Sequence, residues 1–187
     1  MLKDSINVVY PQTLTVSNLI SIALYNSCSL QLAINEANGL NRLPSHLTTE
    51  KEEYVYRSYL ALGQHHIILS EIKDGTNTPV SLQAIKLLAN VMADASRKEI
   101  AMLQVQEWLN DNSASCNTTV QLVAAILYMH DDNLKEAVKL VHRGVNMEQH
   151  ALLVQLYLRM DRLDLAQKEV KAMKAVDEDN TLAQVTH

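Results

Sequence analysis

Two histidine-containing segments are the first places where this sequence could do chemistry. His65 and His66 are adjacent, and imidazole nitrogens are common zinc ligands. Neighbouring residues on a helix point about 100° apart, so the two rings cannot easily share one ion. The second segment, His130-Asp131-Asp132, falls at a turn between two expected helices, where Asp more often caps a helix. Because neither H-E-x-x-H nor C-x-x-C occurs, we expect structural roles for both segments and no metal site.

The candidate nucleophiles lie together at Ser113, Ser115 and Cys116. A catalytic Ser or Cys needs a base within hydrogen-bonding reach, and no spacing in the sequence connects these residues to one. A G-x-S-x-G nucleophile elbow is absent. The two nearest glycines, Gly63 and Gly75, are twelve residues apart, which excludes a P-loop and a dinucleotide-binding loop. We therefore expect no catalytic residues, no cofactor and no enzyme activity.

The composition favours an all-α fold. Of the 187 residues only 4 are Gly and 3 are Pro, too few for the many tight turns of a β-sandwich or β-barrel. Phe is absent and aromatic residues make up only 4% of the chain. The core must therefore consist mainly of Leu, Ile, Val, Ala and Met. The length suits one domain with a sizeable core.

The charge balance and the short apolar runs exclude two kinds of partner. With 16 basic and 21 acidic residues the net charge is -5, the wrong sign for a protein that binds nucleic acid by neutralising phosphates. The longest uninterrupted apolar run, residues 122–129, has eight residues, whereas a helix needs roughly 18 to 20 to span a bilayer. We expect no direct membrane insertion. The absence of a signal-peptide pattern and the two distant cysteines, Cys28 and Cys116, predict a soluble cytosolic chain.

Apolar stripes recur along the chain at the spacing i, i+3, i+4 and i+7, which places four side chains on one face of a helix. Two such stripes are Leu30, Ala33, Ile34, Ala37 and Leu134, Ala137, Val138, Val141, with a related one at Leu163, Ala166, Val170 and Met173. Marker positions within these helices recur with a period near 34 residues, at Ala33, Ile67, Ala101, Ala137 and Ala166. An aromatic residue precedes four of the markers by eight or nine positions, at Tyr25, Tyr59, Tyr128 and Tyr157.

These stripes, and the Gly and Pro residues between them, predict a single α-solenoid over residues 1–187. Its five helix pairs are expected at 16–40, 49–73, 80–110, 118–143 and 147–175, followed by the start of a further helix at 180–187. Polar segments around 42–48, 74–79 and 110–117 are expected to be exposed loops. Helix pairs of this period are tetratricopeptide-like and stack into a right-handed superhelix. An irregular helical bundle is the alternative, because the Trp and Gly of the full repeat signature are missing.

The first helices of the last two pairs are apolar on almost every side. A helix of this kind must be covered on every side, and stacking of repeats covers two flanks. The remaining side is left for a partner or an adjoining segment. We predict five partner-groove positions: Leu122, Ile126, Met129, Leu158 and Arg159. The alternative is that these residues are ordinary core.

One run is specific beyond a generic repeat: M-D-R-L-D-L-A-Q-K-E-V at 160–170, continuing to Leu182. Together with Q-L-A-I-N-E-A at 31–37, the N-T-T helix start at 117–119 and Y-M-H-D-D-N at 128–133, it resembles the epsilon subunit of coatomer, the COPI coat of Golgi-derived vesicles. The resemblance extends over most of the chain. It implies a tetratricopeptide-like, non-enzymatic scaffold.

The resemblance also implies a partner and a location. Family members bind the C-terminal domain of the coatomer alpha subunit and stabilise it within the coat, in retrograde Golgi-to-ER and intra-Golgi transport. They are cytoplasmic and reach Golgi membranes and COPI vesicles through the complex. More helices follow in the family, so we expect this chain to be a C-terminally shortened form. The alternative function is an independent tetratricopeptide adaptor or co-chaperone; few cations on the last two first helices disfavour a clamp for acidic tails.

Overall fold

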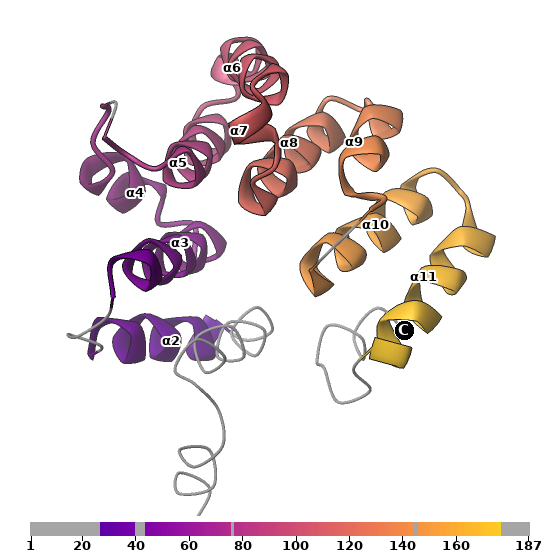
Figure 1. The fold of residues 1–187 in the computed structure, drawn as a ribbon, viewed down its shortest axis with the longest axis horizontal. Coiled ribbons are helices and arrows are strands. Elements are labelled where there is room, and N and C mark those ends of the chain that lie inside the picture. The colour runs from indigo at the N-terminus through magenta and orange to yellow at the C-terminus, as the bar shows by residue number, and fades with distance from the viewer. Residues whose placement is uncertain (1–26, 40–43, 76, 144–145, 177–187) are drawn as a thin grey trace, which may run out of the picture. The chain divides into compact units, whose positions relative to one another are not determined.

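Every described element of the chain is a helix (Figure 1). The computed structural model describes residues 27–39, 44–75, 77–143 and 146–176. Helices that follow one another in the chain pack in contacting pairs, which confirms the all-α, tetratricopeptide-like fold class. The predicted helix at 16–26 and the helix start at 180–187 lie outside the described residues.

The contacts divide the chain into two compact units, Met1–Lys73 and Asp74–His187. In the first unit, α2 (Ser27–Gly39) packs against α3 (Ser45–Ala61), and α3 packs against α4 (His65–Glu71). Three residues of the predicted stripe on α2 are buried: Leu30, Ile34 and Ala37. Helix α3 begins within the predicted loop at 42–48, because the Pro44 carbonyl accepts backbone hydrogen bonds from Leu47 and Thr48 at 3.0 Å each. That part of the loop prediction is wrong.

The second unit contains seven α-helices and one 3₁₀ turn among its described residues. They are α5 (Val80–Ala93), η1 (Ala95–Arg97), α6 (Lys98–Asn110), α7 (Asn112–Ser115), α8 (Thr118–His130), α9 (Leu134–Val141), α10 (Met147–Arg159) and α11 (Leu163–Val176). Helix α8 packs against α5, α6, α7 and α9, while α10 packs against α9 and α11. Nine of the thirteen residues of α8 are buried, as its apolar sequence requires.

A helical turn replaces part of the loop that was predicted at 110–117. The Asp111 carboxylate accepts the Ser113 backbone N–H at 3.0 Å and begins α7. Ala114 is buried on this turn. The prediction of an exposed loop is wrong here, because the short α7 packs against α6 and α8.

One turn geometry recurs between paired helices. Gly63, Asp132 and Asp161 have positive φ angles of 71°, 55° and 56°. In each turn the next residue donates its backbone N–H to the carbonyl of a tyrosine four residues before the positive-φ position: Tyr59, Tyr128 or Tyr157, at 2.9–3.0 Å. This hydrogen bond is that of the Schellman helix ending. The three tyrosines thus occupy the same position relative to the turn, although the bond uses only their backbone carbonyls.

The same turns correct one marker position. Nine residues after each tyrosine lie Ile68, Ala137 and Ala166, which are 0%, 0% and 4% exposed. Ile67 is only half-buried, so Ile68 is the equivalent residue. The α5–α6 pair lacks this turn, because Asp94 is extended at φ -145° and η1 precedes α6. This explains the irregular third repeat.

The Asp132→Gly variant is expected to be more stable than the parent chain by up to about 1 kcal/mol. Glycine adopts a positive φ without the steric penalty of a Cβ atom, and the change removes a carboxylate near a helix C-terminus. Gly63→Ala should lower stability by about 1–2 kcal/mol, even though a Cβ atom there would have open space. Denaturant unfolding measures both. Gly75→Ala is the control, because Gly75 has no positive φ; a destabilised Asp132→Gly variant would contradict the prediction.

Tyr56 on α3 has an altered acidity. Burial and, to a smaller extent, the nearby carboxylates of Glu71 and Glu52 together raise the pKa of its phenol from 10.0 to about 12. The neutral phenol is therefore favoured in the folded chain. Its contribution to stability is complete below pH 10 and is lost as the pH rises through about 12.

Tyrosinate absorbance should therefore show one group titrating near pH 12. We expect Tyr56→Phe to remove this late step. Glu71→Gln should shift it to lower pH, because it removes a neighbouring negative charge. Titration of all the tyrosines near their ordinary pKa would show that this environment is absent.

Candidate functional site

Hydrogen bonds join α8 and α10 at both ends, first turn to first turn and last turn to last turn, so the two helices run in the same direction. In their first turns Gln149 Nε2 donates to Gln121 Oε1 at 3.0 Å. At their last turns Arg159 Nη1 donates to the Met129 carbonyl at 3.3 Å. These are the first helices of two successive pairs, so the two contacts set the position of one pair against the next.

The first of these contacts is part of a buried relay of amides. Gln149 is only 2% exposed, and its partner Gln121 donates in turn to the Ser115 carbonyl at 2.7 Å. A buried amide without a partner destabilises a fold by about 1–3 kcal/mol. Sliding α10 along α8 would break this relay, which therefore fixes the register of the two helices.

The C-terminus of α8 is bound by cations from two other helices. Lys98 Nζ, at the start of α6, donates to the His130 carbonyl at 2.9 Å and lies 2.8 Å from Asp131 Oδ1. Arg159 supplies the second cation, through the Met129 carbonyl. Positive charge at a helix C-terminus complements the helix dipole. In this structure the His130-Asp131-Asp132 segment thus ends a helix.

The structure separates the five predicted groove residues by exposure. Leu122 and Met129 are each 9% exposed and belong to the core of the chain, whereas Leu158 is 48% exposed. Ile126 is half-buried and Arg159 is exposed. We call Ile126, Leu158 and Arg159 the α8–α10 surface, because these three remain accessible. That any of the five contacts a partner stays a prediction.

The exposure of one further apolar residue was not predicted. Leu163, the first residue of α11, is 62% exposed. Its position in an apolar stripe indicated burial, but the stripe is buried through Ala166 and Met173 instead. Residues at the start of a helix are less covered by neighbours than residues at its centre. The position of Leu163 at an expected helix start could therefore have indicated its exposure.

Titratable side chains at α10 and α11 connect the two helices. His150 Nδ1 lies 2.5 Å from Glu169 Oε1, with both side chains mostly covered. Burial raises the pKa of Tyr157, and the nearby Glu169 carboxylate contributes to the same direction. Hydrogen bonds from Arg162, at 2.9 and 3.0 Å, lower the pKa of Asp164. The His150–Glu169 contact joins α10 to α11, whereas Arg162 and Asp164 form a local pair at the start of α11.

The remaining candidates for chemistry are dispersed. His65 Nδ1 is buried without a hydrogen bond, while His66 is exposed. Cys116 is an exposed free thiol. Within the described residues, no three His, Cys, Asp or Glu side chains are grouped so that they could hold a metal ion.

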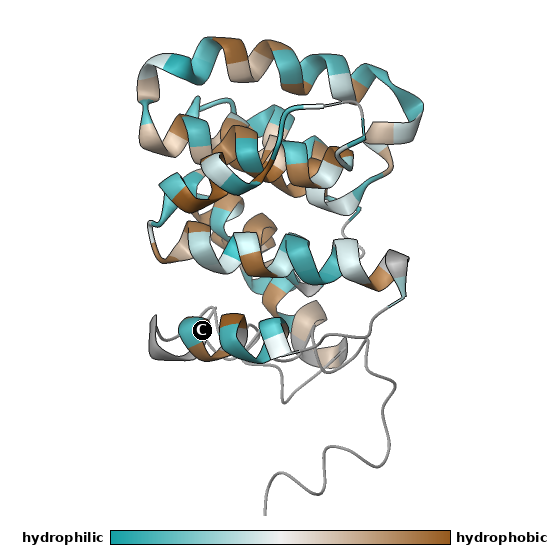
Figure 2. Cartoon of the chain, turned by 90° about the vertical axis from the view of Figure 1, so that its left-hand side faces the viewer, coloured by the Kyte–Doolittle hydropathy of each residue, from teal (hydrophilic) through white to brown (hydrophobic). Residues whose placement is uncertain are grey.

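The helices that face the viewer in Figure 2 carry both hydrophilic and hydrophobic residues. None of the helices in the described ranges is both long enough and apolar enough to cross a membrane.

The paired helices, the parallel α8 and α10 and the recurring turns define a tetratricopeptide-like helical-repeat protein, a class that presents extended surfaces to other proteins. A model of the family "Coatomer epsilon subunit" matches residues 19–187. The chain belongs to the coatomer epsilon subunit family. This is a family of coat-complex subunits and not of enzymes.

Individual relatives agree with this assignment. The chain is 38% identical over 155 residues to coatomer subunit epsilon-2 of Arabidopsis thaliana, covering 83% of this chain and 52% of the relative. It is 39% identical over 157 residues to coatomer subunit epsilon-1 of Oryza sativa subsp. japonica, covering 84% and 53%. With coatomer subunit epsilon of Dictyostelium discoideum it shares 30% identity over 159 residues, covering 82% and 53%. The chain thus spans about half the length of these curated relatives.

Proposed function

We propose that this chain is a structural subunit of the COPI coat that binds and stabilises the C-terminal region of the coatomer alpha subunit. The observation that carries the proposal is the family match over residues 19–187. The chain would act in retrograde Golgi-to-ER and intra-Golgi transport. It would be cytoplasmic and would reach Golgi membranes through the assembled coat.

The α8–α10 surface supplies a mechanism for this binding. Leu158 is 48% exposed and Ile126 is half-buried, so an apolar partner segment that covers them would remove apolar surface from water. Arg159 uses one N–H on the Met129 carbonyl, and its other guanidinium donors can reach a partner's carbonyl or carboxylate. The chemistry is burial of apolar surface with one polar anchor, and no bond is made or broken.

Co-expression with a C-terminal fragment of the alpha subunit from the same organism tests the proposal. We expect the two chains to elute together from a size-exclusion column and to remain together as the salt concentration rises, because an apolar interface is weakly screened. Failure to co-elute at micromolar concentrations would contradict the proposal. Binding that instead requires low salt and an acidic peptide tail would favour the independent adaptor.

A further inference from the structure

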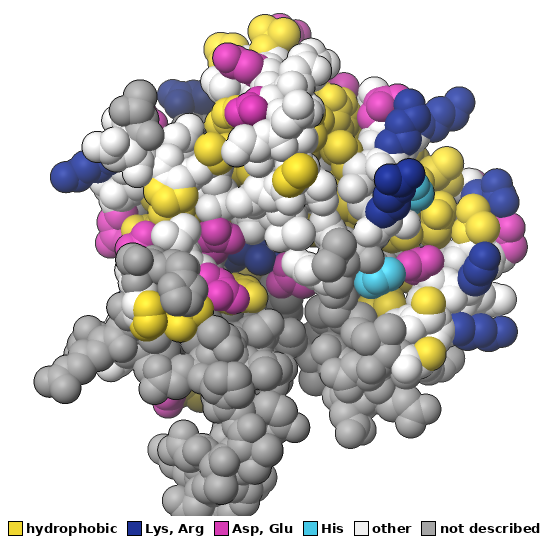
Figure 3. Space-filling view, in the orientation of Figure 1, with side chains coloured by type: hydrophobic (Ala, Val, Ile, Leu, Met, Phe, Trp, Pro, Cys, Tyr) yellow, Lys and Arg dark blue, Asp and Glu magenta, His cyan; other side chains and the backbone are white. Residues whose placement is uncertain are grey.

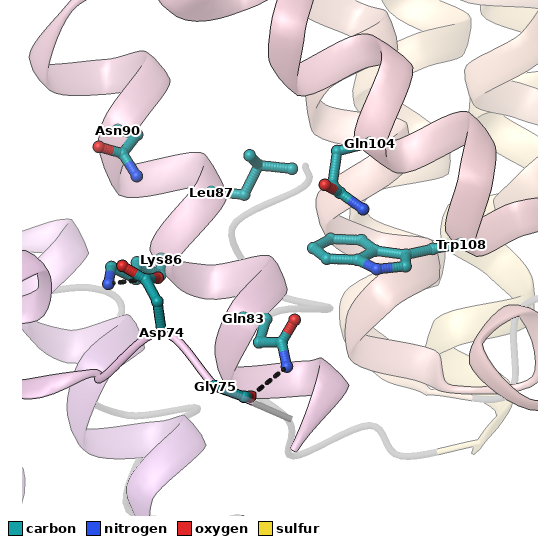
Figure 4. Close-up of a pocket in the computed structure, with 8 residues that line it drawn as sticks. All are labelled: Asp74, Gly75, Gln83, Lys86, Leu87, Asn90, Gln104 and Trp108. Carbon is teal, nitrogen blue, oxygen red and sulfur yellow. Dashed lines mark hydrogen bonds and ion pairs between the residues drawn. The ribbon is translucent and has the colours of Figure 1, made fainter. Parts of the chain in front are cut away.

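A cavity of about 480 Å³ opens between α5 and α6, within the second unit (Figure 4). Gln83, Lys86, Leu87 and Asn90 share one face of α5 and form one wall. Gln104 and Trp108, one turn apart on α6, form the opposite wall. None of these residues belongs to the α8–α10 surface. We call this cavity the α5–α6 groove.

Three amide side chains in the α5–α6 groove are held in fixed orientations. Gln83 Nε2 donates to the Thr78 and Gly75 carbonyls at 2.8 and 3.4 Å. Gln104 Nε2 donates to Glu107 Oε2 at 3.0 Å, and Asn90 Oδ1 accepts from Arg97 Nη1 at 2.9 Å. Each partner is purely an acceptor or purely a donor, so the nitrogen and oxygen of every amide are identified unambiguously.

These hydrogen bonds leave one polar atom of each amide for a ligand. Within the described residues, Gln83 Oε1 and Gln104 Oε1 are acceptors without a hydrogen-bond partner, and Asn90 Nδ2 and Trp108 Nε1 are donors without one. In Figure 4 the Gln83 oxygen points toward the α6 wall and the Trp108 ring extends into the space between the helices. Fixed neutral donors and acceptors on opposite walls match the alternating N–H and C=O groups of a peptide backbone.

The charges at the groove are already paired. Lys86 Nζ lies 2.7 Å from Asp74 Oδ1, Arg97 Nε lies 3.7 Å from Asp94 Oδ2, and Glu107 accepts from Gln104. A charged ligand would compete with these pairs instead of completing them. The groove therefore favours a segment without charged side chains.

The groove continues into exposed apolar surface along α6. Ile100 lies one turn before Gln104 and is 70% exposed, and Leu103 is 68% exposed. Figure 3 shows apolar side chains over α6 at the top of the view. From Ile100 to Trp108 the wall is about 12 Å long at 1.5 Å per residue. An extended chain covers that length with about four residues at ~3.3 Å each.

We propose that the α5–α6 groove binds an extended, uncharged segment of about four residues from a partner protein. Its backbone pairs with Gln83, Asn90 and Gln104, and an aliphatic side chain packs on Trp108 and Leu87. This is a second site, independent of the α8–α10 surface and of the alpha-subunit proposal.

Trp108 is the one tryptophan of the chain, so its fluorescence reports directly on the groove. The probe is the blocked tetrapeptide acetyl-Ala-Leu-Ala-Leu-amide, titrated into the whole chain. We expect a saturable change in Trp108 emission. Binding should weaken about three- to tenfold for Gln104→Ala, the loss of one hydrogen bond, and at least as much for a peptide N-methylated at its central amides.

Gln106→Ala is the matched control, because Gln106 is an exposed amide on the same helix that does not line the groove. It should bind like the parent chain. The proposal is overturned by an emission change that does not saturate, by equal binding to Gln104→Ala and the parent, or by tighter binding of a peptide with a central Asp or Lys. Each of these results leaves co-elution with the alpha subunit unaffected, so the two proposals fail separately.

Discussion

The Ala137→Leu variant is expected to unfold with a free energy about 1–3 kcal/mol lower than that of the parent chain. Ala137 is 0% exposed on α9, which packs closely against α8. Protein interiors are close-packed, so a leucine side chain at this position is expected to displace α9 from α8 or to adopt a strained rotamer. Urea unfolding followed by circular dichroism measures the difference.

The control is the same substitution on an exposed position. Ala172 on α11 is exposed, so Ala172→Leu should change the free energy of unfolding by less than about 0.5 kcal/mol. Ala166→Leu, at the equivalent position of the next pair, should behave like Ala137→Leu. Equal stabilities of Ala137→Leu and Ala172→Leu would show that the helices are not packed as closely as in this structure.

The Leu158→Asp variant is expected to bind the alpha-subunit fragment at least about thirtyfold more weakly than the parent chain. This is the loss typical of a central apolar contact in an interface, about 2 kcal/mol. A carboxylate in its place would be buried without a partner when the complex forms. Isothermal titration calorimetry on the co-purifying pair measures the loss. The variant itself should stay folded, because Leu158 is 48% exposed.

A neighbouring leucine provides the comparison. Leu163 is 62% exposed and begins α11, where an introduced carboxylate complements the helix dipole. Leu163→Asp should therefore bind almost as tightly as the parent chain. Equal losses in the two variants would mean that Leu158 makes no specific contact, and would contradict the assignment of the α8–α10 surface.

Local interactions explain which parts of the fold could be predicted. Helix α8 begins at Thr118 because the Asn117 side chain accepts the backbone N–H groups of Thr119 and Val120 at 2.9 and 3.2 Å. That cap lies within four residues and was predicted from them. The sequence predicted the start of α3 at residue 49, but the helix begins at Ser45. The Pro44 carbonyl accepts the first hydrogen bonds of this helix, from the backbone N–H groups of Leu47 and Thr48. The α7 turn was missed because its burial depends on α6 and α8.

The candidate site was harder to predict for a different reason. Helix α8 is apolar around its whole circumference, so periodicity does not distinguish a residue facing a partner from one facing the core. Leu122 and Met129 proved to be buried within the chain, and Ile126 only half so. The contacts from Lys98 to Asp131 and from Arg159 to Met129 span about one repeat each. Contacts at that separation leave no local pattern in the sequence.

The two cations on the C-terminus of α8 couple neighbouring repeats during opening motions. Lys98 comes from 32 residues before its carbonyl partner and Arg159 from 30 residues after. If α6 or α10 unfolded locally, a carbonyl group at the end of α8 would lose the hydrogen bond that it accepts from Lys98 or Arg159. Amide hydrogens in the last turn of α8 should consequently exchange with solvent together with those of α6 and α10, so that three helices from successive repeats form one cooperative unit.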